Sequence, residues 1–342
     1  MKNPPTPPHA SRAQLAILRA ILTIGRAAGS TQIAAVLRGW GIRLSERTVR
    51  LRLLELDRAG WTELLSRRAG RVLTDAGREE ATRQNILARM AFFVSGRIDE
   101  LNYRMDFSLR SRAGTLVVNT TLLPADALEA ALDAMQPVFA AGLGMGTRLA
   151  VLRPGEISDD RLGTRVPEGR VALVTVCSVS LNGILLKEGI PVTSRYGGLL
   201  EFKNHSPERF VELLEYGGTT LDPLEMFIRA RMTSVARCAR TGNGVVGASF
   251  REFPSVARPA VLAARRQLRA LGLDGIVAIG DPGRPLYGLP VGEGRTGLVL
   301  LGGLNPVAAL EESGISNTSR SLSGFLDYSR LHPIASTRPP QG

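Results

Sequence analysis

The first part of the chain places apolar residues at helical spacing in three consecutive segments, each bounded by a capping residue or a glycine. The first segment runs from Ser11 to Gly29, the second from Ser30 to Gly41, and the third from Ser45 to Gly60. Serine is a preferred N-cap residue and glycine commonly ends a helix. Three short helices in this order predict a helix-turn-helix domain, whose last helix reads base edges in the major groove. We expect the apolar residues of that last helix to face inward: Val49, Leu53, Leu54 and Leu56.

A strand, a basic turn and a second strand follow at residues 61–80. The arginines of the turn indicate the wing of a winged helix-turn-helix domain, where guanidinium groups contact phosphates or enter the minor groove. The alternative is a solvated hairpin with ordinary surface charge. We predict a DNA-binding domain at residues 11–75 and a connecting helix at 76–90. The residues predicted to contact DNA are Ser45, Arg47, Thr48, Arg50, Arg52, Arg67, Arg68 and Arg71.

An internal repeat occupies most of the remaining chain. Two copies of the pattern strand, helix, strand, strand, helix, strand lie at about residues 105–205 and 240–328. The pieces GRVALVTVCSVSLNGILLKEGI (169–190) and GRTGLVLLGGLNPVAALEESGI (294–315) align without a gap. This order is that of the ferredoxin-like βαββαβ fold, an antiparallel sheet with both helices on one face. The fold class predicted for the whole chain is therefore α+β, with a regulatory domain of two such halves at 91–330.

The segments outside the two copies give weaker patterns. Residues 206–240 are predicted to be helical, with a first stretch at 209–214 and a second helix that begins at Asp222 and Pro223. The first ten residues contain four prolines and are predicted to form a disordered arm. The tail at 331–342 is also predicted to be disordered.

Composition places the chain in the ordinary globular class, because 44% of its residues are hydrophobic and 22% are charged. No run of about 18 apolar residues is present, and no signal-peptide pattern opens the chain, so we expect a cytoplasmic protein without membrane contact. The net charge of +12 is unevenly divided: residues 1–110 hold 19 Lys and Arg against 10 Asp and Glu, and residues 111–342 hold 24 against 21. A cationic first third is typical of a module that binds a polyanion. The alternative is frequent use of arginine throughout the chain.

Few residues offer catalytic or metal chemistry. Three scattered histidines and two cysteines predict neither a metal site nor a disulfide framework. Cys177 has no histidine near it in sequence, and a free cysteine is most often a small core residue. The glycine-rich pieces lack the spacing of nucleotide-binding motifs. We therefore expect no catalytic residue, no metal and no tightly held cofactor.

The repeat creates two equivalent turns where a buried strand passes into a helix, at residues 177–180 and 302–305. Backbone N–H groups at helix starts favour anions, so the two turns predict an anion-binding cleft. Lys187 and Arg195 could neutralise carboxylates there. The alternatives are close backbone packing at Gly302 and Gly303, and a solvated helix face at Lys187.

Several blocks of the chain resemble the NrpR-type transcriptional repressors of nitrogen assimilation. The blocks are VCSVSLNGILLKEGIPV, RYGGLLE, GGTTLDPLEMFI and RTGLVLLGGLNPVAALEESGI, and the resemblance extends from about Ser11 to about Tyr328. It implies a DNA-binding repressor whose regulatory domain senses 2-oxoglutarate. Some members of the family carry two regulatory domains in tandem, whereas this chain carries one. The residues predicted to bind the effector are Cys177, Ser178, Asn182, Lys187, Arg195, Gly197, Gly198, Thr219, Thr220, Gly302, Gly303 and Asn305.

Two other classes of function fit parts of the pattern. A small-molecule enzyme with an accessory nucleic-acid-binding head would need a catalytic acid, base or nucleophile. A constitutive architectural DNA-binding protein would leave the regulatory repeat without a use. We expect a homodimer on a palindromic operator, because one winged helix contacts a single half-site.

Overall fold

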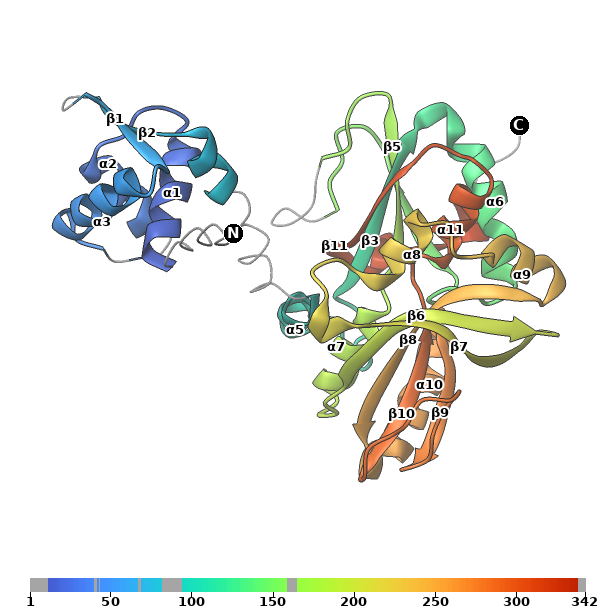
Figure 1. Cartoon of the computed structure of the whole chain (residues 1–342). Helices are drawn as coiled ribbons and strands as arrows, with labels where there is room; N and C mark the ends of the chain where they lie inside the picture. The colour runs from blue at the N-terminus through green and yellow to red at the C-terminus, as the bar shows by residue number, and fades with distance from the viewer. Residues whose placement is uncertain are drawn as a thin grey trace, which may run out of the picture. The chain divides into compact units, whose positions relative to one another are not determined.

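The computed structural model describes residues 12–39, 42, 44–66, 69–81, 94–158 and 165–337, and it divides the chain into two compact units (Figure 1). The N-terminal unit is residues 1–91 and the C-terminal unit is residues 92–342. The cap predicted at Ser11, the predicted arm, Arg67, Arg68 and residues 82–90 of the predicted connecting helix lie outside the described residues.

The N-terminal unit is a winged helix built in the predicted order. Its elements are α1 (Arg12–Ile24), α2 (Ser30–Gly39), α3 (Glu46–Arg58), β1 (Thr62–Ser66) and β2 (Gly70–Leu73), followed by a helical stretch at 75–81. The two strands pair antiparallel. One apolar cluster joins the three helices, and its innermost side chains are Ile17, Leu18, Ile33, Leu37, Val49 and Leu56.

One core prediction on α3 was wrong. Val49, Leu53 and Leu56 are buried as expected, but Leu54 is 47% exposed. The buried residues follow the spacing i, i+4, i+7 of one helix face, and Leu54 lies about 100° around the helix from Leu53. Leu54 therefore belongs to the outer face of α3.

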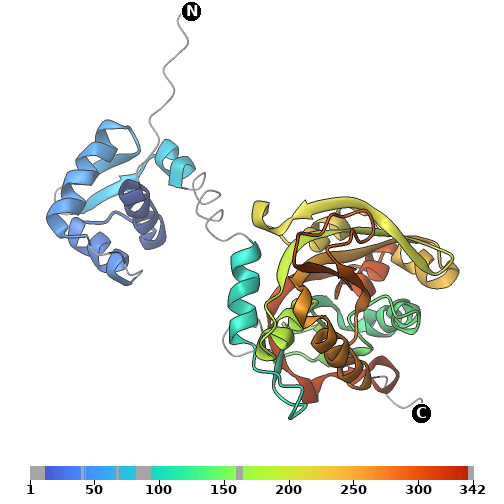
Figure 2. The ribbon, with the colours of Figure 1, turned by 90° about the horizontal axis from the view of Figure 1, so that it is seen from below.

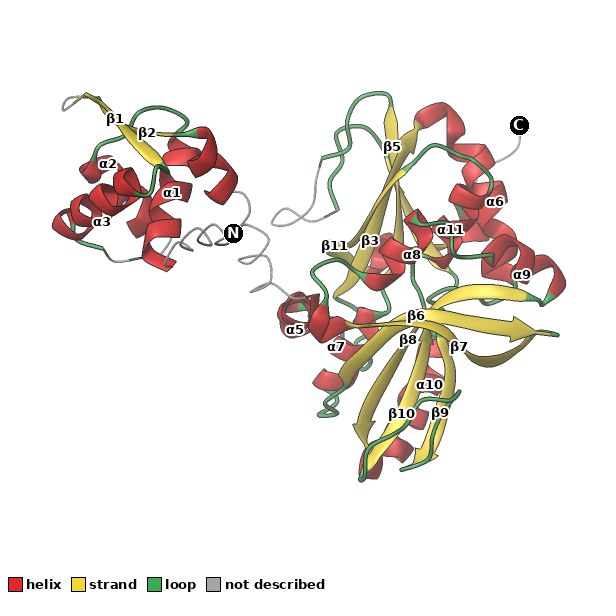
Figure 3. Ribbon diagram, in the orientation of Figure 1, coloured by secondary structure: helices red, strands yellow, loops and turns green. Residues whose placement is uncertain are grey.

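The C-terminal unit contains two five-stranded sheets and the helices that cover them (Figures 1 and 3). The helices are α5 (Val94–Arg104), α6 (Leu128–Ala140), α7 (Val179–Lys187), α8 (Pro223–Arg229), α9 (Val235–Thr241), α10 (Arg258–Ala270) and α11 (Asn305–Glu312). The strands are β3 (Thr115–Pro124), β4 (Arg148–Leu152), β5 (Arg170–Val176), β6 (Thr193–Lys203), β7 (Ser206–Glu215), β8 (Gly244–Pro254), β9 (Ile276–Pro282), β10 (Arg295–Leu301), β11 (Thr318–Asp327) and β12 (His332–Pro333).

The two repeats exchange their last elements, which the sequence did not predict. One sheet has the order β11-β3-β5-β4-β12 and the other has the order β7-β6-β8-β10-β9. In each sheet three strands come from one copy, and the strand that completes the ferredoxin-like order comes from the other copy. β6 of the first copy pairs with β8 of the second, and β11 of the second pairs with β3 of the first. The expectation of two self-contained βαββαβ halves is therefore corrected to two halves of mixed origin.

The helices follow the same exchange. α11 packs against α6, and α7 lies with α10 around a shared set of apolar side chains. α5 lies beside α7 (Figure 2). Two apolar clusters fill the unit, and alternate residues of β5 and of β10 enter one cluster or the other. Both faces of β5 and β10 are thus buried, which explains why these two strands are apolar at nearly every position.

Two further sequence predictions differ from the structure. Residues 206–215 form strand β7 rather than a helix, and they pair with β6 through a turn in which Asn204 and His205 have positive φ. Two central residues with φ > 0 are the requirement of a tight type I′ hairpin turn. The tail is ordered through residue 337, because β12 pairs with β4 and the side chains of Leu331 and Ile334 are buried. Residues 338–342 lie outside the described residues.

Candidate functional site

The outer face of α3 carries a stripe that mixes cationic and apolar side chains. Arg47, Leu51, Leu54 and Arg58 recur at i, i+4, i+7 and i+11, and all four are exposed. Arg50 lies beside the stripe, and its only ion pair among the described residues is a long contact of 4.0 Å with Glu46. Exposed arginines on this helix suit contact with phosphates and base edges, and exposed leucines suit contact with thymine methyl groups.

The other predicted DNA contacts on α3 have partners inside the unit. The Ser45 hydroxyl accepts a hydrogen bond from the Thr48 amide at 3.1 Å and lies 2.8 Å from the Thr48 hydroxyl, which caps the helix. Arg52 donates to both carboxylate oxygens of Glu55 at 3.0 and 2.8 Å. Gln14 of α1 donates to the same carboxylate at 2.9 Å, so Arg52 belongs to a contact that joins α1 and α3.

Arg71 lies on β2, opposite Leu64, and its side chain is paired inside the unit. Its Nε donates to both carboxylate oxygens of Asp57 at 3.0 and 2.8 Å, and its side chain is 16% exposed. The Thr62 hydroxyl donates to the same carboxylate at 2.6 Å. Arg71 therefore ties the hairpin to α3 through its Nε atom, and its contact with phosphate stays a prediction.

In the C-terminal unit the two strand-to-helix turns make equivalent hydrogen bonds. The Cys177 amide donates to the Val117 carbonyl at 2.9 Å, and the Gly302 amide donates to the Gly247 carbonyl at 2.8 Å. The same two carbonyls accept a second bond, from the Ser180 hydroxyl at 2.8 Å and from the Asn305 side-chain amide at 2.9 Å. The repeat thus extends from the sequence to individual bonds.

The second turn, residues 302–305, is fully used in packing. Asn305 also accepts a bond from the Gly247 amide at 2.9 Å and donates to the Leu143 carbonyl at 2.8 Å. A Cβ atom on Gly303 would lie 2.0 Å from the Val176 carbonyl oxygen, and one on Gly302 would lie 2.9 Å from a methyl group of Leu224. These predicted effector residues therefore have packing contacts and hydrogen bonds inside the unit, and Leu304 of the same turn lines a cleft of about 300 Å³.

The first turn instead faces a buried arginine that the sequence analysis missed. Arg251 of β8 donates to the Ser178 carbonyl at 2.9 Å and to the Ser178 hydroxyl at 2.8 Å, and it also donates to the Asn182 side-chain oxygen. Asn182 in turn donates to the Ser194 hydroxyl at 3.0 Å. The repeat alignment contained a signal for this residue, since Thr121 occupies the equivalent position of the first copy.

Three titratable groups, Tyr216, Cys177 and Asp222, interact with the charge of Arg251. Burial raises the pKa of the Cys177 thiol to about 12, although the Val179 and Leu322 amides oppose the shift. Burial also raises the pKa of Tyr216. Burial raises the pKa of Asp222 to about 6, although the amides of Glu225 and Leu224 and the charge of Arg251 lower it. The cluster therefore combines one cation with neutral or partly neutral neighbours.

A cleft of about 540 Å³ lies next to this cluster, and Asp222 and Leu322 form part of its wall. Its other lining residues are Val94, Arg97, Thr220, Leu221, Glu225, Arg320, Ser321 and Ser323. Pairing of β11 with β3 is interrupted between Arg320 and Gly324, and Leu322 has a φ of 48° within this bulge. A bulky residue at positive φ stores backbone strain, and strain and bulges concentrate near functional sites.

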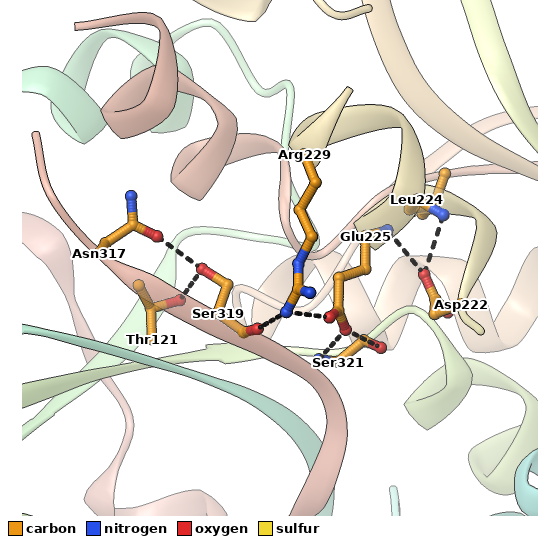
Figure 4. Close-up of polar contacts among 8 residues, drawn as sticks. All are labelled: Thr121, Asp222, Leu224, Glu225, Arg229, Asn317, Ser319 and Ser321. Carbon is orange, nitrogen blue, oxygen red and sulfur yellow. Dashed lines mark hydrogen bonds and ion pairs between the residues drawn. The ribbon is translucent and has the colours of Figure 1, made fainter. Parts of the chain in front are cut away.

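A polar contact between α8 and β11 forms one side of the cleft (Figure 4). Asp222 accepts bonds from the Leu224 and Glu225 amides and so caps α8. Glu225 accepts bonds from the Ser321 amide and hydroxyl at 3.0 and 2.9 Å. Arg229 pairs with Glu225 at 2.6 Å and donates to the Ser319 carbonyl at 3.1 Å. A second cleft of about 300 Å³ is lined by Glu225 and Arg229, but there the arginine is already neutralised.

The remaining predicted effector residues are spread around the unit. Lys187 ends α7 near Asp106, whose pKa is lowered mainly by hydrogen bonds from the Thr115 hydroxyl and amide and to a smaller extent by the charge of Lys187. Arg195 lies 3.7 Å from the Glu252 carboxylate and over the ring of Tyr196. Gly197 packs against Pro223 and Tyr216, and Gly198 packs against the Glu212 carbonyl. Thr219 bonds within its own turn, whereas Thr220 lines the larger cleft.

Comparison with known proteins identifies the family of both units. Residues 92–333 match the family described as NrpR regulatory domains NRD1 and 2, and residues 15–81 match the family described as Ribonuclease R winged-helix domain. The chain belongs to the NrpR family. It is 33% identical over 327 residues to the global nitrogen regulator NrpRI of Methanosarcina mazei, covering 96% of this chain and 99% of that protein.

Other members of the family differ in length. The global nitrogen regulator NrpR of Methanococcus maripaludis is 28% identical over 312 residues, and the match covers 87% of this chain and 53% of that protein. A crystal structure of a nitrogen repressor-like protein from Methanococcus jannaschii superposes with a TM-score of 0.59 at 27% identity, covering 70% of this chain and 97% of that one. Full-length agreement with the M. mazei NrpRI supports a nitrogen-related transcriptional regulator.

Proposed function

We propose that this NrpR-family chain is a repressor of nitrogen-assimilation genes whose C-terminal unit binds 2-oxoglutarate and thereby weakens its hold on operator DNA. The observation that carries the proposal is the presence in one chain of a winged helix and of the NrpR regulatory domains. Its DNA-contacting surface would be the exposed stripe on α3, with Arg47 and Arg50 at the N-terminal half of the helix.

The cleft beside β11 suits the effector chemically. 2-Oxoglutarate carries two carboxylates, and the residues that line the cleft include Arg97, Arg320, Ser321 and Ser323. Arg97 is paired with Glu100 at 3.1 Å. Arg320 is exposed and makes no ion pair with any other residue that the structure describes. Arginine binds carboxylates with two parallel hydrogen bonds, so an unpaired arginine in a cleft favours an acidic ligand.

The regulators matched by this chain give no support to the enzyme alternative. The Cys177 thiol is buried and its pKa is raised to about 12, so it is protonated at neutral pH and is a poor nucleophile. Among the described residues, no group of three or more histidines, cysteines and carboxylates could hold a metal ion. The described helices include none that is long and apolar enough to cross a bilayer.

Titration of labelled operator fragments with the purified chain, with and without 2-oxoglutarate, tests the proposed switch. Coupling of about 1–3 kcal/mol would weaken DNA binding by roughly 5- to 150-fold. Linkage requires operator DNA to weaken 2-oxoglutarate binding by the same factor. Equal affinity for DNA at zero and saturating 2-oxoglutarate would refute the switch. Light scattering on the same samples tests the proposed homodimer, which a strict monomer on DNA would contradict.

A matched pair on α3 tests the DNA-binding surface. Arg50→Ala removes an exposed cation and should weaken operator binding by roughly 10- to 150-fold, since a charge-assisted contact is worth roughly 1.5–3 kcal/mol. Arg52→Ala removes a cation that makes two hydrogen bonds to Glu55, so it should lower the stability of the N-terminal unit. The operator affinity of the folded variant should stay near that of the parent chain. Equal losses of DNA affinity in both variants would contradict this assignment.

A further inference from the structure

Helix α3 differs from the other two helices of the N-terminal unit in what it exposes to solvent. Leu51 is 57% exposed and Leu54 is 47% exposed, whereas none of the large apolar side chains described on α1 and α2 is exposed. A single exposed leucine is common on a protein surface. Two leucines three residues apart are neighbours on one face of a helix, so this pair forms a small apolar surface on the helix predicted to contact DNA.

Cationic side chains flank the two leucines on the same face. Arg47 lies one turn before Leu51, Arg58 lies one turn after Leu54, and both arginines are exposed. Neither arginine lies at ion-pair distance from a carboxylate of a residue that the structure describes. A ligand for this face should therefore be anionic at its edges and apolar between them. Duplex DNA has both properties, because phosphates border the major groove and the methyl groups of thymine project into it.

A second copy of the chain fits this face poorly. Two copies related by a two-fold axis would bring the arginines of both faces together, and like charges across an interface are unfavourable. The nearby carboxylates of Glu46 and Glu55 already contact Arg50 and Arg52. Two partly exposed leucines also offer much less than the roughly 800 Å² that each partner buries in a stable interface. The charge and the size of the face both favour DNA.

We propose that Leu51 and Leu54 determine operator specificity by contacting the 5-methyl groups of two thymines in the major groove. The two side chains are about 4.5 Å apart along the helix axis, since the helix rises about 1.5 Å per residue. Neighbouring bases of one DNA strand are about 3.4 Å apart, so the two leucines suit thymines at neighbouring positions. The inference rests on the proposed DNA binding and is independent of the proposed effector.

Replacement of thymine by uracil in the DNA tests the inference, because deoxyuridine lacks the 5-methyl group and keeps the base-pairing edge. The full chain first selects its preferred site from a pool of random duplexes in the absence of 2-oxoglutarate. Each thymine of the selected site is then replaced in turn by deoxyuridine, and the affinity of the chain for each duplex is measured. Loss of one methyl contact should weaken binding about 4-fold at each of two neighbouring thymines.

Three variants assign the methyl groups to side chains. In Leu51→Ala the effect of uracil should disappear at one of the two thymines, and in Leu54→Ala it should disappear at the other. Leu64→Ala is the matched control, because Leu64 is 50% exposed but lies on β1 rather than on α3. This variant should keep both uracil effects. All three positions are exposed, so the melting temperatures should stay near that of the parent chain.

The remaining outcomes count against the inference or against the proposed function. Affinities that are the same for thymine and uracil at every position overturn the inference, as do uracil effects that persist in both Leu51→Ala and Leu54→Ala. A lower molecular mass of these variants in light scattering, with the uracil effects intact, would assign the leucines to a contact between two copies of the chain. If no duplex is selected, the proposed DNA binding fails together with the inference. A selected site that 2-oxoglutarate does not release refutes only the proposed effector.

Discussion

The two strand-to-helix turns of the C-terminal unit make equivalent hydrogen bonds, but their side chains have different partners. In each turn a backbone amide and a side chain donate hydrogen bonds to one carbonyl group on the first strand of the repeat. The acceptor is Val117 in the first copy and Gly247 in the second. At the second turn Gly303 and Asn305 pack closely against two other segments of the chain, at Val176 and Leu143. At the first turn Ser178 and Asn182 meet a buried arginine instead. The repeat therefore supplies the scaffold, and the departures from the repeat mark the candidate site.

The exchange of strands explains why both turns lie together. Each turn is the point where the chain leaves one sheet and passes its helix and last strand to the other. Gly303 touches the Val176 carbonyl, so the two crossings are in direct contact. A ligand or a substitution at one crossing can therefore act on the elements of both sheets. The following predictions compare the crossings, beginning with the largest expected effect.

Gly303→Ala should be the most disruptive change. The added Cβ would lie 2.0 Å from a backbone carbonyl oxygen that cannot move without displacing β5. Overpacking of this kind costs at least ~3 kcal/mol of unfolding free energy. Urea denaturation measures the loss. Gly96→Ala in α5 is the matched control, since its Cβ meets no atom within 4 Å and alanine at this exposed position should stabilise the helix by about 0.5–1 kcal/mol. A stable Gly303→Ala chain would show that the crossings are not in contact.

Asn305→Ala should cost about 3 kcal/mol, because it leaves the buried Gly247 amide without its acceptor and the Leu143 carbonyl without its donor. Thermal and urea unfolding of the full chain measure the change. The loss should be the same with and without 2-oxoglutarate if the second turn serves packing alone. If the folded variant lost affinity for 2-oxoglutarate, the result would indicate that this turn contributes to effector binding.

Local signals explain what the sequence predicted correctly. The cap at Ser45, the three helices and the hairpin of the N-terminal unit depend on residues adjacent in the chain, so periodicity and capping rules found them. The repeat likewise gave the order of strands and helices. β7 was missed because Phe210, Val211, Leu213 and Leu214 fit helical spacing as well as a two-sided strand.

Partners distant in the chain could not be predicted in the same way. The apolar pattern of β6 or β11 is identical whether the strand pairs with its own copy or with the other, so the exchange left no periodic signal. Arg251 occupies a buried position on a strand where a charged residue ordinarily indicates exposure to solvent. Ser178 and Asn182 were found, because they stand out at a turn, but the cation that they bind was not.

Asp222 gives the first turn a dependence on pH that the second turn lacks. Its pKa is raised to about 6, against about 3.9 in an unfolded chain, so the folded state holds the proton more tightly. This contribution to stability is therefore present at low pH and is lost as pH rises from about 4 through 6. Asp222→Asn keeps the cap on α8 without the charge and should gain about 3 kcal/mol at pH 8 but nothing below pH 4. An equal gain at both values would show that burial does not govern this carboxyl.

Ser180→Ala should have the smallest effect, although it removes the bond equivalent to that of Asn305. The Val117 carbonyl keeps its bond from the Cys177 amide after the change, so no buried group loses its last partner. The loss is then that of one neutral hydrogen bond, about 1 kcal/mol, against the larger cost of the orphaned amide in Asn305→Ala. Paired urea titrations of the two variants test this ratio. If Ser180→Ala cost as much as Asn305→Ala, the hydroxyl would be positioning the N-terminal turn of α7 against Arg251, and its loss should then also weaken 2-oxoglutarate binding.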